Sequence, residues 1–456
     1  MPRALFIGRF QPFHQGHLDA IKQISSDLST SSRQAKIIIG IGSSQYSGTK
    51  DNPYSFAERK AMIEKIIKNK TKYKIVAIPD IHDETNWVKH VEKIVGKFDV
   101  VYTGNKVVAK LFRAKKHQVK NIKKNIDISA TELRQETERL FEKLHHTCYT
   151  WEQCETMAPL TLEINKLKKK QKAVILAHSY QTPDIMYGVA DYIGDSYGLS
   201  KIAQKIKAKK IIFCSVYFMG ETAKILNTKK QVLVPATSGC SLAESITAKD
   251  VRKLKQKHPG VPVVCYINTY ADVKAESDIV CTSANALKVI NSLKNEEVIF
   301  IPDKLMGKNL QKLTKKKLIL WDGTCIVHED FKAEWLIKLR KQYPDAKVLA
   351  HTECNPAVVD HADLAGSTTD IVNYVKNTKT KNLMLITECG ITDRVRTEFP
   401  NKNIVGTCNL CPYMKKIKLE DILQALKKPT KKQIVEVDKD IIKKAKKAVE
   451  KMMKIT

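Results

Sequence analysis

Three cysteines recur at a nearly constant interval in the second half of the chain. Cys240, Cys325 and Cys411 are separated by 85 and 86 residues (325 − 240 and 411 − 325). Each follows a short apolar run of the kind that forms a β-strand. One thiolate at the same place in three copies of a unit predicts side chains that converge. Thiolates that converge are ligands for a metal ion or an iron–sulfur cluster.

The segments that carry these cysteines repeat as well. Each unit has three strand-like apolar runs separated by gaps of helix length, and a period this long predicts a triplicated α/β domain. The runs are Ala173–Ala177, Ile211–Cys214 and Val232–Pro235 in the first unit, Val261–Tyr266, Val298–Ile301 and Leu318–Trp321 in the second, and Lys347–Ala350, Leu383–Thr387 and Asn403–Gly406 in the third.

Polar residues stand where the first strand of each unit ends. His178 ends the first such strand, Tyr266 and Asn268 the second, and His351 and Glu353 the third. Ligands of α/β sheets bind beyond the carboxyl ends of the strands. The three strand ends are therefore predicted to line one pocket.

A second pattern repeats in register with the cysteines. In each unit an aspartate is followed five positions later by a serine or threonine that opens a helical stretch. The pairs are Asp191 and Ser196, Asp278 and Ser283, and Asp363 and Thr368, with Ser367 beside the last. A hydroxyl at this place would cap a helix, and a helix N-terminus binds phosphate or carboxylate. Plain capping is the alternative, but three copies in register favour a shared anion site.

The first 145 residues carry a different motif. A short strand, Ala4–Ile7, is followed by a glycine turn with His14 and His17, and then by a helix over Leu18–Ser26. A strand, a glycine turn and a helix N-terminus together form a phosphate-binding architecture. The His-x-Gly-His motif is the signature of nucleotidyltransferases. A second motif, Ile128-Ser-Ala-Thr-Glu-Leu-Arg134, places an arginine near a capped helix start, where it would meet a triphosphate.

From about Thr156 to its end, the chain resembles the quinolinate synthases. The resemblance rests on Ile175-Leu-Ala-His-Ser-Tyr-Gln181, Tyr217-Phe-Met-Gly-Glu-Thr-Ala-Lys224, Gly239-Cys-Ser-Leu-Ala243, Thr282-Ser-Ala-Asn-Ala286 and His351-Thr-Glu-Cys354. It implies a pseudo-threefold α/β domain around a [4Fe–4S] cluster held by Cys240, Cys325 and Cys411. It also implies condensation of iminoaspartate with dihydroxyacetone phosphate. The substrate would be bound by His178, Ser196, Tyr266, Asn268, Ser283, His351, Glu353, Ser367 and Thr368, among which Tyr266, His351 and Glu353 are suited to acid–base catalysis.

Residues 4–136 resemble the archaeal type of nicotinamide mononucleotide (NMN) adenylyltransferase. The resemblance rests on Gly8-Arg-Phe-Gln-Pro12, Gly42-Ser-Ser-Gln45, Asn52-Pro-Tyr-Ser-Phe-Ala-Glu-Arg59 and Asn86-Trp-Val88. It implies a Rossmann-like domain that forms NAD from NMN and ATP, with Mg²⁺ accompanying the ATP. His14, His17 and Arg134 would serve the triphosphate. Trp87 would stack on the nicotinamide ring, although a core aromatic is the alternative, and Arg9, Ser44, Arg59 and Asn105 would line the nucleotide pocket.

Cys408 competes with Cys411 as a ligand, because the two form a Cys-x-x-Cys pair. The repeat favours Cys411, since it and Cys325 each lie seven residues after the start of their strands (325 − 318 and 411 − 404). Cys408 is then a spare thiol that could form a reversible disulfide with Cys411. Cys354 is predicted to be a buried neutral thiol. Packing roles are expected for Cys148, Cys154, Cys214, Cys265, Cys281 and Cys389.

The length of 456 residues accommodates these parts. We expect a nucleotidyltransferase domain at 1–145, a helical joint at 146–172, and α/β units at 173–260, 261–346 and 347–456. The formal charge of +31 is spread in short lysine runs, which argues against nucleic-acid binding. Anionic substrates would gain from a positive field, but solvated lysine faces are the simplest account. No apolar run is long enough to span a membrane and no signal peptide is visible, so a cytoplasmic protein is expected, with a homo-oligomer as an option.

Two alternatives remain at this point. The three cysteines could hold a structural Zn²⁺ ion instead of a cluster. The N-terminal domain could be a non-catalytic nucleotide-sensing module that regulates the second half of the chain, although intact His14, His17 and Arg134 favour catalysis.

Overall fold

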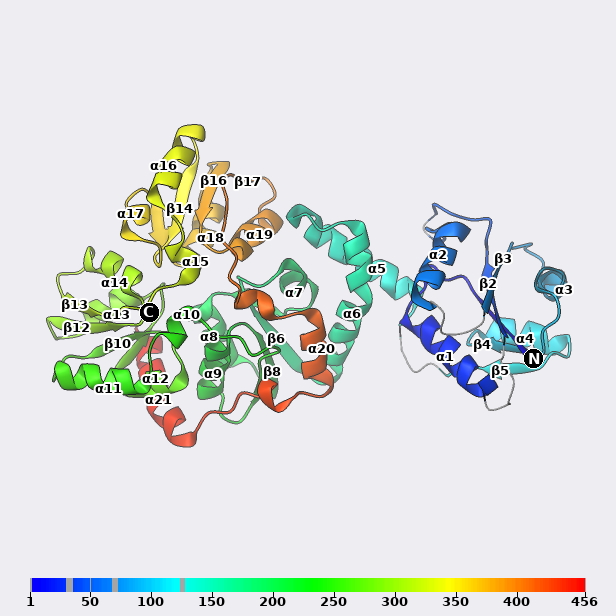
Figure 1. Ribbon diagram of the computed structural model, residues 1–456, viewed down its shortest axis with the longest axis horizontal. Coiled ribbons are helices and arrows are strands. Elements are labelled where there is room, and N and C mark those ends of the chain that lie inside the picture. The colour runs from blue at the N-terminus through cyan, green and yellow to red at the C-terminus, as the bar shows by residue number, and fades with distance from the viewer. Residues whose placement is uncertain (1, 30–35, 50, 68–72, 124–127, 456) are drawn as a thin grey trace. The chain divides into compact units, whose positions relative to one another are not determined.

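The computed structural model describes residues 2–29, 36–49, 51–67, 73–123 and 128–455 (Figure 1). The chain divides into two compact units. The first comprises Met1–Arg139 with Glu155–Leu162, and the second comprises Leu140–Cys154 with Glu163–Thr456. Among the described residues, no helix is both long and apolar enough to cross a membrane.

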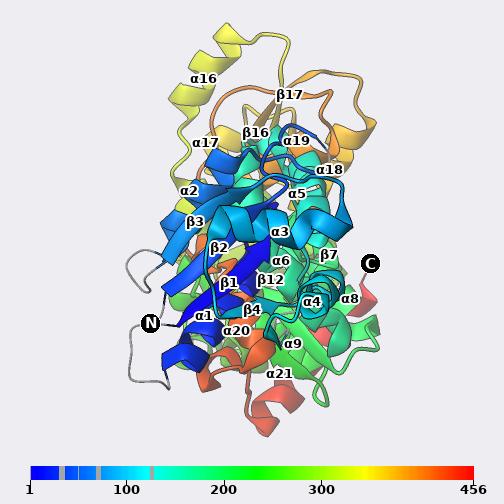
Figure 2. The same cartoon turned by 90° about the vertical axis from the view of Figure 1, so that its right-hand side faces the viewer.

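The first unit is built on one parallel sheet of five strands in the order β3-β2-β1-β4-β5 (Figure 2). Helices α1 and α2 pack on one face, and α3 and α4 pack on the other. The bounds are β1 Arg3–Gly8, α1 Gln15–Ser29, β2 Lys36–Gly42, α2 Phe56–Ile67, β3 Tyr73–Ile78, α3 Glu84–Val95, β4 Val100–Thr103, α4 Lys106–Ala114 and β5 Val119–Asn121.

The isoleucine run of β2 shows why this sheet is covered on both sides. Ile37, Ile39 and Ile41 point into the core beneath α1, whereas Ile38 packs in the core beneath α3. Successive side chains of a strand alternate between the faces, so a continuous apolar run requires cover on both. This is the Rossmann-like fold predicted from the sequence.

The second unit contains three parallel sheets of four strands, and all three have the same strand order. The orders are β7-β6-β8-β9, β11-β10-β12-β13 and β15-β14-β16-β17. The bounds are β6 Ala173–His178, β7 Tyr192–Gly194, β8 Lys210–Cys214, β9 Gln231–Leu233, β10 Val263–Tyr266, β11 Ile279–Cys281, β12 Glu297–Ile301, β13 Lys317–Leu320, β14 Lys347–His351, β15 Leu364–Gly366, β16 Asn382–Ile386 and β17 Asn403–Ile404. The triplicated α/β fold is confirmed, and the sequence analysis missed only the short edge strands β7, β11 and β15.

The repeated aspartates fix these edge strands. The carboxylates of Asp191, Asp278 and Asp363 accept hydrogen bonds from the backbone N–H groups of Ile175, Val263 and Val348, at 2.8, 2.8 and 2.9 Å. Each aspartate N–H donates in return to the carbonyl of the same strand residue. The aspartate therefore repeats because it ties the edge strand to the first strand of its unit.

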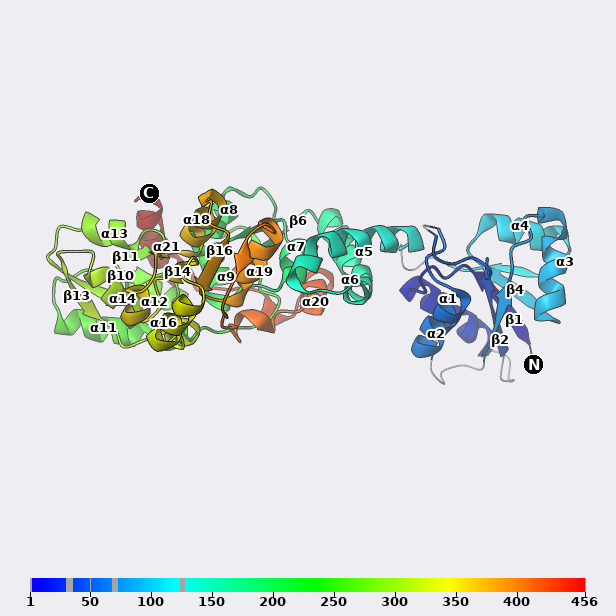
Figure 3. The same cartoon turned by 90° about the horizontal axis from the view of Figure 1, so that it is seen from above.

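Helices connect and close the second unit. The segment predicted as a helical joint, 146–172, contains α6 (Trp151–Lys170), and α5 (Ala130–Leu144) precedes it, with a short turn between them. Near the C-terminus, α20 (Leu419–Lys427) precedes α21 (Lys439–Lys454), and α21 packs against β11 and α12 (Ala271–Glu276) (Figure 3). The tail of the third repeat thus supports the second repeat.

Candidate functional sites

The three cysteine loops are anchored in the same way. In each repeat the second strand leads into a helix, namely α9 (Tyr217–Leu226), α14 (Lys304–Gln311) or α19 (Cys389–Glu398). The N–H of the first helical residue donates to the carbonyl two residues before the cysteine. The pairs are Tyr217 with Ser238, Lys304 with Gly323 and Cys389 with Asn409, at 2.8, 2.8 and 3.0 Å. The repeat therefore delivers one thiol per sheet to an equivalent place.

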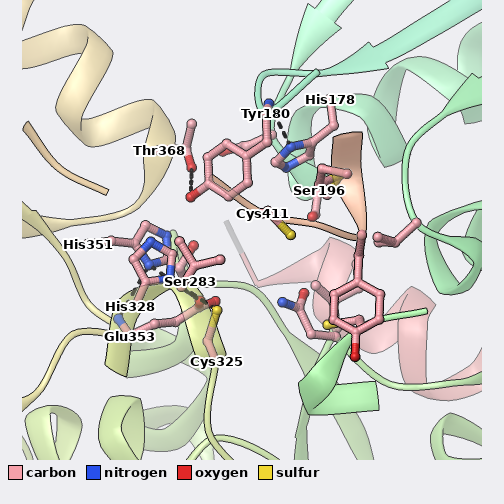
Figure 4. A pocket seen from close by; sticks show the side chains of 18 of the residues that line it. His178, Tyr180, Ser196, Ser283, Cys325, His328, His351, Glu353, Thr368 and Cys411 are labelled. Carbon is pink, nitrogen blue, oxygen red and sulfur yellow. Dashed lines mark hydrogen bonds and ion pairs between the residues drawn. The ribbon is translucent and has the colours of Figure 1, made fainter. Parts of the chain in front are cut away.

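All three thiols line a single cavity. Figure 4 shows Cys325 and Cys411 facing the same space as His178, Ser196 and Glu353. Burial raises the pKa of Cys240 to about 12 and also raises the pKa values of Cys325 and Cys411. Buried thiols ionise when a metal replaces the proton. This set of three thiol donors on one cavity fits a metal ion or a cluster.

The two histidines predicted at the strand ends share one tautomer. His178 Nδ1 accepts from Tyr180 N–H at 3.1 Å, and His351 Nδ1 accepts from Glu353 N–H at 3.3 Å. A nitrogen that accepts cannot carry the proton, so the neutral ring carries it on Nε2. Burial lowers the pKa of His178 to about 3 and that of His351 to about 4. Both rings are therefore neutral Nε2–H donors at neutral pH.

Glu353 lies at the centre of a buried network. It accepts from the Tyr266 hydroxyl at 2.5 Å and from His328 Nδ1 at 2.7 Å. Burial alone would favour the neutral acid, but His351, His328 and the Tyr266 hydroxyl outweigh it and hold the pKa of Glu353 well below its usual value. Burial and the Glu353 charge raise the pKa of Tyr266. The site therefore combines an ionised carboxylate with a protonated phenol.

The predicted anion-binding hydroxyls fall into two groups. Ser196, Ser283 and Thr368 line the cavity, but Ser367 does not. The expected capping role was misplaced by one residue in the first and third repeats. Asp195 caps α8 (Ser196–Lys205), and Ser367 caps α18 (Thr368–Asn377). In the second repeat, Asn285 precedes α13 (Ala286–Ser292) and caps no backbone N–H of that helix. Because the preceding residue provides the cap, the hydroxyls of Ser196 and Thr368 remain at the cavity.

Two further residues of this cavity were missed by the sequence analysis. Tyr180 lines it and lies two residues after His178, which is where Asn268 and Glu353 lie in the other repeats. The repeat could therefore have identified Tyr180. His328 Nε2 also lies 3.1 Å from the Thr387 hydroxyl, and its ring stacks on His351. His328 stands three residues after Cys325, a position that holds no histidine in the other repeats.

Three expectations about the remaining cysteines were wrong. Cys389 and Cys408 form a disulfide bond, so Cys389 is not a packing residue and Cys408 is not a spare thiol beside Cys411. Sequence spacing could not reveal this pair, because an isolated bridge between Glu388 and Asn409 brings the two segments together. Cys148 is exposed rather than packed. Burial of Cys154, Cys214, Cys265, Cys281 and Cys354 agrees with prediction.

The first unit has its own cavity, of about 700 Å³, at the ends of β1, β2 and β4. His14 and His17 line it, and their Nδ1 atoms accept from the backbone N–H groups of Gly16 and His14, at 3.1 and 3.2 Å. Burial lowers the pKa of His14 to about 4, and burial together with His14 lowers that of His17 further. Both neutral rings therefore offer Nε2–H at the N-terminus of α1.

The other predicted residues of the first unit take different positions. Arg9, Trp87 and Asn105 line the cavity of the first unit, and the side-chain oxygen of Asn105 caps α4. Ser44, Arg59 and Arg134 do not line it. Buried Arg59 donates to the carbonyls of Arg9, Gly42, Ser43 and Ser55, and so holds the loops at the cavity edge. Arg134 donates to the Gln11 carbonyl at 2.7 Å, next to the histidine loop.

Comparison with known proteins agrees with this division. Residues 162–454 match the family described as Quinolinate synthetase A protein, and residues 5–136 match the family described as Cytidylyltransferase-like. The quinolinate synthase of Sinorhizobium fredii is 46% identical over 321 residues, which cover 70% of this chain and 89% of that protein. The quinolinate synthase of Caulobacter vibrioides is 44% identical over 329 residues, which cover 71% and 88%.

Among solved structures, a bifunctional NMN adenylyltransferase/ADP ribose pyrophosphatase from Francisella tularensis aligns with 21% sequence identity. The alignment has a TM-score of 0.26 and covers 39% of this chain and 60% of that one. A similarity this low carries no argument about activity.

The fold and the cavity of the second unit define the class: a triplicated α/β protein with one thiol from each repeat at a shared acid–base site. Within that class, the chain belongs to the quinolinate synthase family. The region before it, residues 5–136, is similar to the Cytidylyltransferase-like family, so the predicted fusion of two different domains is confirmed.

Proposed function

We propose that this chain is a bifunctional enzyme of NAD biosynthesis. Its second unit condenses iminoaspartate with dihydroxyacetone phosphate to form quinolinate, and its first unit forms NAD from NMN and ATP. The observation that carries the first activity is the convergence of three thiols with Glu353, Tyr266 and two neutral histidines on one cavity. The sequence relatives of this region are quinolinate synthases.

Cys240, Cys325 and Cys411 would hold a [4Fe–4S] cluster. Three equivalent thiols suit a cluster that keeps one iron without a protein ligand, and such an iron supplies Lewis-acid chemistry when the cluster is bound. The backbone hydrogen bonds to the carbonyls of Ser238, Gly323 and Asn409 hold the three cysteine loops in place without using the thiols themselves. The loops therefore do not depend on the sulfur atoms, although Cys325 Sγ lies 3.3 Å from His328 Nδ1.

The protein's own groups would bind the anionic substrates and transfer protons. Neutral His178 and His351 donate from Nε2 to carboxylate or phosphate oxygens, and Ser196, Ser283 and Thr368 add hydroxyl donors. Glu353, kept ionised, accepts the proton that leaves the substrate carbon during dehydration. Tyr266, kept protonated, donates to Glu353 and keeps its carboxylate oriented.

In the first unit, the NMN phosphate attacks the α-phosphate of ATP and releases pyrophosphate. The reaction needs no covalent enzyme intermediate, so positioning and charge neutralisation provide the rate. His14 and His17 donate from Nε2 to the triphosphate at the N-terminus of α1, and Mg²⁺ arrives with the ATP. Trp87 provides a ring surface in the same cavity for the nicotinamide.

Anaerobic assay of both reactions on one preparation tests this proposal. Quinolinate formation together with a brown protein that contains about four irons per chain supports the cluster. A colourless protein that contains zinc favours the structural Zn²⁺ alternative. If ATP binds but NAD does not form, and quinolinate synthesis responds to ATP, the first unit is a sensing module.

A further inference from the structure

The loop that carries Cys411 has a contact that the other two cysteine loops lack. Glu388 precedes α19 and caps it, accepting from Gly390 N–H at 2.6 Å. Its other oxygen, Oε1, accepts the backbone N–H of Cys411 at 3.1 Å. The corresponding residues before α9 and α14 are Val216, which has no acceptor, and Asp303, which accepts from Met306 N–H.

Glu388 is also linked, through Lys415, to a residue that lines the cavity. Its Oε1 lies 3.0 Å from Lys415 Nζ, and that ammonium donates to the Tyr180 carbonyl at 2.6 Å. Glu388 is fully buried. One carboxylate therefore joins the main chain of a thiol-bearing loop in the third repeat to the main chain of a cavity-lining tyrosine in the first.

We propose that Glu388 is a positioning residue that sets the place of the Cys411 thiol and, through Lys415, that of Tyr180. A hydrogen bond from a backbone N–H to a buried carboxylate is charge-assisted and short-ranged, so it restrains the loop more than a neutral contact would. The inference concerns the placement of Cys411 and rests on the proposed function only for the claim that this thiol is a cluster ligand.

Three variants separate positioning from general stability. Glu388→Ala removes both contacts. Glu388→Gln keeps an oxygen for the Cys411 N–H but loses the charge that faces Lys415. Glu398→Gln is the matched control, because Glu398 lies on the same helix and pairs with Arg394 at 2.9 Å without touching the cysteine loop.

The first measurement uses the metal-free protein. Alkylation of Cys411 relative to Cys240, followed by mass spectrometry, should rise about tenfold in Glu388→Ala, because a charge-assisted hydrogen bond is lost. Glu388→Gln should lie between that variant and the parent, and Glu398→Gln should match the parent. A parent-like ratio in Glu388→Ala overturns the inference. If that variant does not fold, a parent-like ratio in Glu388→Gln does so.

The second measurement uses the iron-loaded protein. Iron release to a chelator should be about tenfold faster in Glu388→Ala, and the electron paramagnetic resonance spectrum of the reduced protein should change. Parent-like release together with a parent-like spectrum also overturns the inference. Parent protein that takes up no iron contradicts the proposed cluster instead, and the alkylation ratio still decides the role of Glu388.

Discussion

The cavities of the two units use the same device to orient their histidines. In His14, His178 and His351, Nδ1 accepts the backbone N–H of the residue two positions later, which leaves Nε2–H to face the ligand. The cavities differ in what surrounds these rings. In the second unit an ionised carboxylate, Glu353, lies among them, whereas in the first unit the two histidines lie against each other, with ring centroids 3.7 Å apart.

This difference indicates two kinds of chemistry. A carboxylate beside a phenol and neutral imidazoles can accept and redistribute protons, as a dehydration requires. A pair of adjacent neutral imidazoles at a helix N-terminus instead binds a polyanion, and its positive charge develops only when the phosphates arrive. The cavity of the second unit is therefore suited to transforming a carbon skeleton, and the cavity of the first unit to positioning phosphates.

The largest expected effect is the loss of iron when one of the three thiols in the cavity of the second unit is removed. Replacement of Cys240, Cys325 or Cys411 by alanine should abolish iron binding and quinolinate formation, because two thiols are too few to retain a cluster. NAD formation should persist in each variant. Iron content and the two assays check this.

Cys408→Ala is the control for this prediction. It removes the disulfide to Cys389 but leaves all three cavity thiols in place, so it should retain iron. If the Cys408 variant loses iron while the Cys411 variant keeps it, the assignment of Cys411 as a ligand is wrong.

The next largest effect is the loss of NAD formation while quinolinate synthesis is retained. His17→Ala should lower NAD formation by about 10²–10³-fold, because it removes a donor to the triphosphate. Quinolinate synthesis should stay near the parent rate. A large loss of both activities would instead support a regulatory role for the first unit.

A smaller effect tests the charge state of the histidine pair. His14 has a pKa of about 4 in the free protein, below the ordinary value of about 6.5. Bound phosphates stabilise the protonated ring and raise that pKa, so ATP binding takes up protons. Affinity should therefore increase as the pH falls from neutral towards about 4, the pKa of His14 in the free protein.

Calorimetry of Mg–ATP binding in buffers with different ionisation enthalpies measures this proton uptake directly. His14→Asn should reduce it, because the amide cannot be protonated. A binding enthalpy that does not depend on the buffer would show that the rings stay neutral in the complex.

The two cavities were also predictable from the sequence to different degrees. The repeat predicted the three thiols and the strand-end residues in the cavity of the second unit. Equivalent positions in three copies of one fold must lie at equivalent places in the structure. His328 has no such copies and was missed. The disulfide between Cys389 and Cys408 depends on a tertiary bridge, which no spacing encodes.

In the first unit, the motif predicted the positions of His14 and His17, but it could not show whether the arginine side chains point into the cavity. Arg59 follows a motif that resembles a nucleotide site, yet its guanidinium is buried and satisfied by backbone carbonyls. Whether an arginine faces a ligand or supports a loop depends on which carbonyls lie within reach. That information belongs to the tertiary fold.

The smallest effect concerns the choice of adenylyl acceptor in the cavity of the first unit. Trp87 lines this cavity, and its ring packs edge-to-face against Phe112 with centroids 5.7 Å apart. A stack on the nicotinamide ring is worth about 0.5–1.5 kcal/mol beyond area burial, so Trp87→Ala should raise the KM for NMN several-fold. The KM for ATP should hardly change, because His14 and His17 hold the triphosphate. The parent should not adenylylate pantetheine phosphate or FMN. A higher rate with either acceptor than with NMN would refute the acceptor assignment and leave the nucleotidyltransferase class intact.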